Sequence, residues 1–292
     1  MGPVRICLLR KANLRKLRDA KPRVLESSAT FERHEGPQDR RAAESRPEWR
    51  IGMSIGIRVE DLEMYGASLE MPKDAVKAQF RITLKALRKK FGFWGMLGVF
   101  LDTYSIQRGL RRDFPETREK AAGISKIIEK ELFALSGIFL ALAKRLGRNE
   151  AYEFLKYEVI YELAPTSMSL LYQVPELTKC EGDVFENFKK MNIALFERTT
   201  TDGTWLMESY EDEPDKLTID IATCANVELF NELNVPELGQ FGCDHDVAGC
   251  SAIEEDVNCD FRRFCTIANG DDHCLFEFYR RGTAPDNAHL NI

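Results

Sequence analysis

The sequence predicts an α+β fold in which a helical N-terminal half is followed by an antiparallel sheet with short helices. Between about residues 70 and 190, apolar residues recur at intervals of three and four, the spacing of helices that bury one face. After Met191 the pattern changes to alternating and β-branched residues around turn sequences such as Thr201-Asp-Gly203. A chain of 292 residues can bury a full core, so both halves are expected to pack as one unit.

Composition divides the chain into four parts. Residues 1–52 hold 13 Lys/Arg against 7 Asp/Glu and little apolar periodicity, which predicts a disordered or dispensable basic tail. Residues 53–190 form the helical part. Residues 191–283 form a cysteine-rich α+β part that packs against it, and residues 284–292 form a flexible tail.

Removal of the basic tail should leave the melting temperature nearly unchanged, because residues 1–52 offer few apolar side chains to the core. Thermal unfolding of the full chain and of a chain that begins at Met53 tests this expectation. A fall of more than a few degrees, roughly 1 kcal/mol in a domain of this size, would show that the tail belongs to the fold.

The helical part contains apolar periodicity interrupted by Pro and Gly, which mark the starts and ends of helices. Helices are expected over residues 73–91, 116–146, 148–163, 167–172 and 183–190. Asp113-Phe-Pro-Glu116 is typical of a helix start, and a break is expected near Ser136-Gly137. Ala164-Pro165 is expected to stop the helix that begins at Arg148, because proline cannot donate an internal hydrogen bond.

Residues 91–101 form the longest run of apolar and aromatic residues, next to the basic triplet 88–90. The run is too short to span a bilayer, and no other segment reaches the 18 to 20 apolar residues that a span requires. Two interpretations remain, a buried helix end or connection and a segment that lies on a membrane surface.

The second half is expected to form an antiparallel sheet. Strands are predicted over residues 194–199, 204–210 and 217–223, a short helix over 227–233, a helix or loop over 243–255, and a hairpin of 261–268 with 273–280. Asn269-Gly270 supports the hairpin, because both residues tolerate the positive φ of a tight turn.

Charge and cysteine content limit the function classes. The net charge is −6, and with the basic tail set aside the remainder carries about −12, which argues against nucleic-acid binding by the folded part. No signal peptide precedes the eight cysteines, so we predict a cytoplasmic protein with reduced thiols rather than a disulfide framework. A small molecule is the expected partner, and homo-oligomerisation is left open.

The chemistry concentrates in the last quarter, where Cys224, Cys243, His245, Asp246 and Cys274 supply thiols, an imidazole and a carboxylate. On a helix, Cys243 and Asp246 share a face and His245 points elsewhere. A neighbouring carboxylate raises the pKa of a thiol, so Asp246 alone would not activate Cys243. Two mechanisms are therefore open. In one, a histidine or a helix N-terminus stabilises the thiolate of Cys243. In the other, Asp246 deprotonates water and the thiol stays neutral. Packing in the core is the competing interpretation for each cysteine.

These motifs resemble the L-2-amino-thiazoline-4-carboxylic acid hydrolase family. The resemblance rests on Arg263-x-x-Thr266-x-Ala-x-Gly-Asp271-x-x-Cys274-x-Phe-x-Phe278, preceded by Cys224, Leu233-Asn-Val-Pro-Glu-Leu-Gly239 and Cys243-x-x-Asp246. Two departures are the pair Asp272-His273, where small or variable residues are expected, and an additional Cys259-Asp-Phe261.

The resemblance implies a cofactor-independent hydrolase that opens a small cyclic amidine of the thiazoline type at a C–N or C–S bond. Cys243, Asp246, Cys274 and His245 are the predicted catalytic residues, with Asp246 as base and a thiol as nucleophile or donor. The predicted substrate-binding residues are Cys224, Arg263, Thr266, Asp271 and His273, of which Arg263 is suited to a substrate carboxylate.

Two alternatives remain open. Zinc could be held by four of Cys224, Cys243, His245, Asp246, His273 and Cys274, but no Cys-x-x-Cys or His-x-x-x-His pair supports a metal site, and none is assigned. The Gly-Asp-x-x-Cys-x-Phe ending also resembles 4-vinyl-reductase-type domains, which implies a non-catalytic module that binds or senses a small ligand.

Overall fold

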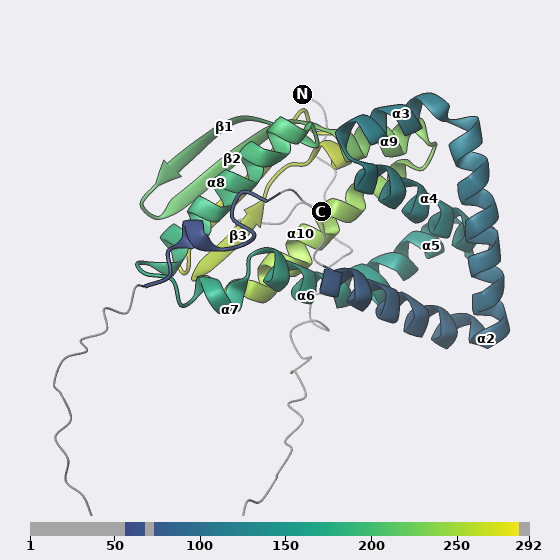
Figure 1. Cartoon of the computed structure of the whole chain (residues 1–292), viewed down its shortest axis with the longest axis horizontal. Coiled ribbons are helices and arrows are strands. Elements are labelled where there is room, and N and C mark those ends of the chain that lie inside the picture. The colour runs from purple at the N-terminus through teal and green to yellow at the C-terminus, as the bar shows by residue number, and fades with distance from the viewer. Residues whose placement is uncertain (1–55, 68–72, 286–292) are drawn as a thin grey trace, which may run out of the picture. The chain divides into compact units, whose positions relative to one another are not determined.

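The computed structural model describes residues 56–67 and 73–285, and Figure 1 shows helices first and a sheet after them. The helices of the first half are α2 (Lys73–Asp113), α3 (Pro115–Ile124), α4 (Lys126–Leu146), α5 (Arg148–Leu155), the π-helical turn η2 (Lys156–Ile160), α6 (Tyr161–Leu171), α7 (Val174–Leu177) and α8 (Val184–Asp202). The second half contains β1 (Trp205–Glu213), β2 (Lys216–Cys224), α9 (Ala225–Glu232), α10 (Gly239–Ile253), β3 (Cys259–Arg263) and β4 (Cys274–Arg280). The predicted α+β fold class is confirmed.

The four strands form one antiparallel sheet in the order β1-β2-β4-β3. Side chains alternate along β2, so Leu217, Ile219 and Ile221 are buried on one face. Phe276 and Phe278 of β4 extend that face, and helix α8 packs across it through ring contacts such as Phe188 with Phe278. The sheet therefore buries one apolar face beneath α8.

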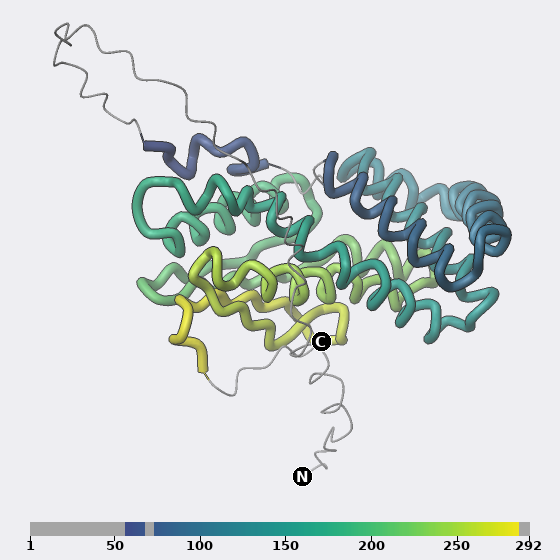
Figure 2. Tube along the Cα trace, turned by 90° about the horizontal axis from the view of Figure 1, so that it is seen from below, coloured from purple at the N-terminus to yellow at the C-terminus, as the bar shows by residue number. Residues whose placement is uncertain are grey.

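Two hydrophobic clusters make up the core. One lies between the sheet and α8, and the other lies among α2, α4, α5 and α9. Both views show α2 to α5 at one end of this arrangement and the sheet at the other (Figures 1 and 2). Helix α10 contributes to both clusters, Phe241 to the helical one and Cys250 and Ile253 to the one under the sheet.

Helix α2 confirms the predicted helix at residues 73–91 and continues beyond it. It bends at Gly92, whose φ of 69° and ψ of 179° are readily adopted only by glycine. The run 91–101 lies across the bend, and its two faces differ. Met96 and Val99 are buried, whereas Trp94 and Leu101 are exposed, so the expectation of a buried segment is correct for one face only.

The break in the long helix 116–146 occurs at Ser125, so the expected break at Ser136-Gly137 is wrong. Ser125 is extended, and its hydroxyl accepts the Ile127 N–H at the start of α4. Ser136 instead donates its hydroxyl to the Leu132 carbonyl inside a continuous helix. Pro115 begins α3 as expected.

The expected stop at Ala164-Pro165 is also wrong, because α6 runs through Pro165 to Leu171. The π-helical turn η2 comes just before α6, and Leu163, Ala164 and Met168 are buried against α10. A side chain at Gly249 of α10 would begin 2.9 Å from Met168 and 3.0 Å from the Ala164 carbonyl. Close helix packing therefore maintains α6 where local sequence favours an end.

The expected strand at 194–199 is wrong, because these residues form the last turns of α8. Three consecutive threonines there donate their hydroxyls to carbonyls one turn earlier, Thr199 and Thr200 to Phe196 and Thr201 to Glu197. Phe196 is buried beneath the sheet with ring contacts to Trp205 and Phe276. Tertiary burial at helical spacing outweighs the strand preference of threonine.

The other elements of the second half follow the prediction. Helix α9 covers the expected short helix, residues 243–255 lie mostly in α10, and β3 pairs with β4 as the predicted hairpin. The connection is longer than a tight turn and contains a 3-10 turn, Ile267–Asn269. The tail predictions concern residues 1–52 and 284–292, most of which lie outside the described residues. Among residues 56–67 and 73–285, no helix is long and apolar enough to cross a membrane.

Candidate active site

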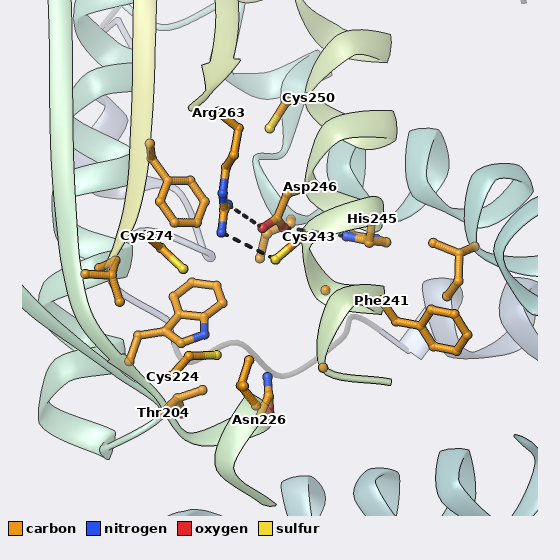
Figure 3. Close-up of a pocket in the computed structure, with 18 of the residues that line it drawn as sticks. Thr204, Cys224, Asn226, Phe241, Cys243, His245, Asp246, Cys250, Arg263 and Cys274 are labelled. Carbon is orange, nitrogen blue, oxygen red and sulfur yellow. Dashed lines mark hydrogen bonds and ion pairs between the residues drawn. The ribbon is translucent and has the colours of Figure 1, made fainter. Parts of the chain in front are cut away.

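A cavity of about 300 Å³ lies where the two hydrophobic clusters meet at α10. Most of its lining is apolar, with side chains from α4, α6, α8, α9, α10 and the sheet. Its polar lining includes six of the nine predicted site residues, namely Cys224, Cys243, His245, Asp246, Arg263 and Cys274 (Figure 3). The fold thus gathers side chains that lie up to fifty residues apart in the sequence.

Helix α10 places Cys243 and Asp246 on the same side of the cavity, as their three-residue spacing predicts. Asp244 points to the opposite side, where it accepts hydrogen bonds from Lys156 at 2.6 Å and from Tyr152. Both partners come from the helical half. This buried contact fixes the rotation of α10 and therefore the direction of its two cavity residues.

Arg263 is the central cation of the site. It ends β3 and is 2% exposed, with its guanidinium 3.5 Å from the ring centroid of Phe276. Nη1 donates to Asp246 at 3.0 Å, and Nη2 donates to the Cys243 sulfur at 3.6 Å. Burial opposes the charge, but Asp246 and Cys243 outweigh it and keep the pKa of Arg263 above its ordinary value. The pair therefore presents Asp246 as a carboxylate held in a fixed direction.

The Cys243 thiol is buried, and its surroundings favour the neutral form. Burial raises its pKa from 9.0 to about 12, with Arg263 lowering it and Asp246 raising it further. Cys243 thus resembles a neutral hydrogen-bonding group more than a resting nucleophile.

Cys224 and Cys274 face the cavity from the sheet (Figure 3). Cys224 ends β2 and begins α9; burial raises the pKa of its thiol, while the amides of Val227 and Asn226 oppose that shift. The Cys274 sulfur accepts the Ile267 N–H at 3.2 Å. Both thiols are therefore oriented by backbone at the cavity wall.

His245 lines the cavity but points away from Arg263 (Figure 3). Its Nε2 lies 2.5 Å from the Ser167 hydroxyl of α6, and its Nδ1 lies 3.9 Å from Asp246. The ring is thus held between α6 and α10, which suits a residue that positions Asp246 rather than one that attacks a substrate.

Three predicted substrate-binding residues do not line this cavity. The Thr266 hydroxyl accepts the Asn269 N–H, and the Asp271 carboxylate accepts the Thr266 N–H at 2.8 Å, so both shape the β3–β4 connection. His273 lies 3.3 Å from Asp220, with its side chain 44% exposed. The place of Thr266 and Asp271 in the motif is explained by the connection that they shape, whereas His273 contacts β2.

The structure also adds lining residues that the motifs did not indicate. Thr204 and Trp205 come from the end of α8 and the start of β1, Asn226 follows Cys224, and Phe241 begins α10. Asn226 could have been inferred from its place in the first turn of a helix after Cys224. The contributions of Trp205 and Phe241 depend on tertiary packing and have no local signal.

The seven described cysteines are free thiols. Among the residues that the structure describes, no group of three or more His, Cys, Asp or Glu side chains is placed to hold a metal ion. The two histidines considered as zinc ligands have other partners: His273 pairs with Asp220, and His245 contacts Ser167. The arrangement at the cavity is instead one of a carboxylate, a guanidinium and thiols.

Thiol labelling should report the protonation of Cys243. Iodoacetamide at pH 7.5, followed by peptide mapping, should modify the partly exposed Cys180 well before Cys243. The pKa of Cys243 in the folded protein lies above that of a thiol in the unfolded chain. The stability that the neutral Cys243 thiol contributes is therefore present below pH 9.0 and lost as pH rises toward about 12. Equal labelling of both cysteines at pH 7.5 would show that Cys243 is a thiolate.

Comparison with known proteins gives one match. A family model described as L-2-amino-thiazoline-4-carboxylic acid hydrolase matches residues 125–278, more than half of the chain. The matched range runs from the start of α4 into β4 and contains every residue that lines the cavity. Searches of curated proteins and of solved structures gave no match.

Proposed function

Because the chain belongs to the L-2-amino-thiazoline-4-carboxylic acid hydrolase family, we propose that it hydrolyses a small cyclic amidine of the thiazoline type in the cavity at α10. The observation that carries the proposal is the Asp246 carboxylate, which is fixed by buried Arg263 beside Cys243 in this cavity. A volume of about 300 Å³ suits a small ligand built on a five-membered ring.

Asp246 is the proposed general base. Water adds to the ring carbon between nitrogen and sulfur; one of its protons passes to Asp246, and the electron pair of the C=N bond moves to that nitrogen. The tetrahedral carbon then bears oxygen, two nitrogens and sulfur. In its collapse the hydroxyl proton passes to the nitrogen that received the electron pair, the C=O bond forms, the C–S bond breaks, and the proton held by Asp246 passes to the departing sulfur. The product is a ring-opened thiol with a carbamoyl group on nitrogen, which equals the substrate plus one water.

The thiols have a supporting role in this proposal. The raised pKa of Cys243 makes a thiolate attack costly, so Cys243 is assigned as a neutral group that orients the amidine or the departing sulfur. Cys274 and Cys224 line the wall of the cavity opposite Cys243. Acid quenching during turnover followed by intact mass measurement should find no covalent adduct, whereas an adduct on Cys243 or Cys274 would establish thiol catalysis.

Arg263 was predicted to pair with a substrate carboxylate. Its contacts favour another role, that of holding Asp246 in place, because Nη1 already donates to Asp246 and Nη2 donates to the Cys243 sulfur. The two roles are separable with two substrates, 2-amino-thiazoline-4-carboxylic acid and the same ring without the carboxylate. If Arg263 binds that group, KM rises for the truncated ring. If Arg263 only holds Asp246, the KM values stay similar.

The proposed function is tested by turnover. Purified protein is incubated with the two thiazolines, and the released thiol is measured colorimetrically together with the carbamoyl product by mass spectrometry. We expect equal amounts of both products. Saturable binding of a thiazoline by calorimetry without any product would favour the ligand-sensing alternative. Activity that is lost with a chelator and restored by zinc would favour the zinc-dependent alternative.

A further inference from the structure

A stripe of apolar side chains is exposed on α2 after its bend. Trp94, Leu97, Leu101 and Tyr104 are 81%, 36%, 73% and 61% exposed. Their spacing of three, four and three residues places them on one face of the helix, over roughly 15 Å. We call these four residues the Trp94 stripe. No helix of the described part covers them, and α2 lies outside the range matched by the family model.

The helix that carries the stripe is strongly basic. Helix α2 holds ten Lys/Arg and three Asp/Glu, whereas the whole chain has a net charge of −6. Arg108 and Arg112 continue the same face after Tyr104, and the Arg108 guanidinium lies 5.7 Å from the Tyr104 ring. Most of these cations lie before the bend at Gly92; after it, Arg111 pairs with Glu129 and Arg112 with Asp113, so Arg108 is the cation next to the stripe.

A second observation comes from the residues on either side of the bend. A groove of about 520 Å³ lies there, lined by Leu84, Lys85, Arg88, Lys89, Phe93 and Met96. Lys89 pairs with Glu158, while Lys85 and Arg88 have no ion pair among the described residues. We call it the elbow groove. Its three cations surround apolar side chains, an arrangement that suits a phosphate joined to a hydrocarbon chain.

We propose that the Trp94 stripe and the elbow groove dock this protein on an anionic phospholipid membrane. An exposed tryptophan with leucine and tyrosine on a basic helix is the pattern of a helix that lies in the membrane interface. A second copy packed through the same faces would bring Lys85, Arg88 and Arg108 of both chains together, which their charge opposes. Anionic headgroups complement Arg108 at the end of the stripe and Lys85 and Arg88 in the groove.

The test uses the full chain and sedimentation with lipid vesicles. Vesicles of phosphatidylcholine alone are compared with vesicles that contain about 30% phosphatidylserine, at low and at high salt. We expect binding to the anionic vesicles only, weakened by salt. The double variants Trp94→Ser/Leu101→Ser and Lys85→Glu/Arg88→Glu should each lower the vesicle partition coefficient roughly tenfold or more.

Tyr210→Ser is the matched control, because Tyr210 is 43% exposed on β1, and it should bind as the parent does. Circular dichroism confirms that each variant is folded. Three results would overturn the proposal. They are absence of binding to anionic vesicles, binding unchanged in both double variants, and a dimer that dissociates in Trp94→Ser/Leu101→Ser. The second result would assign binding to another part of the chain, and the third would assign the stripe to a second copy.

Discussion

Replacement of Asp246 by asparagine should lower kcat roughly 10²- to 10⁴-fold on a thiazoline substrate, the usual contribution of a general base. The amide keeps the shape of the side chain, and its oxygen can still accept a hydrogen bond from Arg263. It cannot take a proton from water. The measurement is kcat by thiol release, at a temperature where circular dichroism shows the variant to be folded.

Asp271→Asn is the matched control for this experiment. Asp271 lies in the same sequence motif, but its carboxylate accepts the Thr266 N–H and does not line the cavity. We expect kcat to remain within a few fold of the parent. An Asp246→Asn variant with full activity, or an Asp271→Asn variant with the larger loss, would remove Asp246 from the role of base.

Replacement of Lys156 by methionine should produce the largest loss of stability. Its partner Asp244 is 1% exposed, so the substitution leaves a buried carboxylate without its cation. Breaking a buried pair in this way costs about 3–5 kcal/mol, which lowers the melting temperature by roughly 10 °C in a domain of this size. Urea and thermal unfolding both measure the change.

Two further variants separate the buried charge from lost packing. Lys156→Met/Asp244→Asn removes both charges but keeps a partner for the Tyr152 hydroxyl, and it should recover most of the stability. Lys189→Met is the control, because Lys189 is equally buried but its partners Asp212 and Glu186 are 45% and 41% exposed. It should cost about 1 kcal/mol or less. Equal losses for Lys156→Met and Lys189→Met would contradict this account of Asp244.

The sequence was enough to predict the helices and strands whose local pattern agrees with their tertiary environment. The alternation of Leu217, Ile219 and Ile221 matches the buried face of β2, and Pro115 begins α3. It was insufficient where packing outweighs local preference. Thr199 to Thr201 remain helical because they bond to their own helix, and Pro165 remains inside α6 because that helix packs tightly on α10.

The candidate site shows the same limit. Cys243 and Asp246 could be paired from their spacing alone, since three residues on a helix share a face. The motif also indicated Arg263 and Cys274, which line the cavity from β3 and β4. It could not distinguish them from Thr266 and Asp271, because only the folded connection shows that these side chains bond to its backbone, Thr266 to the Asn269 N–H and Asp271 to the Thr266 N–H. Trp205 lines the cavity from the start of β1 and has no sequence signal.

A crystal structure with a non-hydrolysable cyclic amidine bound tests the central claim most directly. The proposal predicts a ring in the cavity at α10, with its amidine group within hydrogen-bond reach of Asp246 and its sulfur side toward the cysteines. Arg263 should retain its contact with Asp246. A ligand bound at another surface, or one in the cavity with its reactive carbon turned away from Asp246, would contradict the proposed active site.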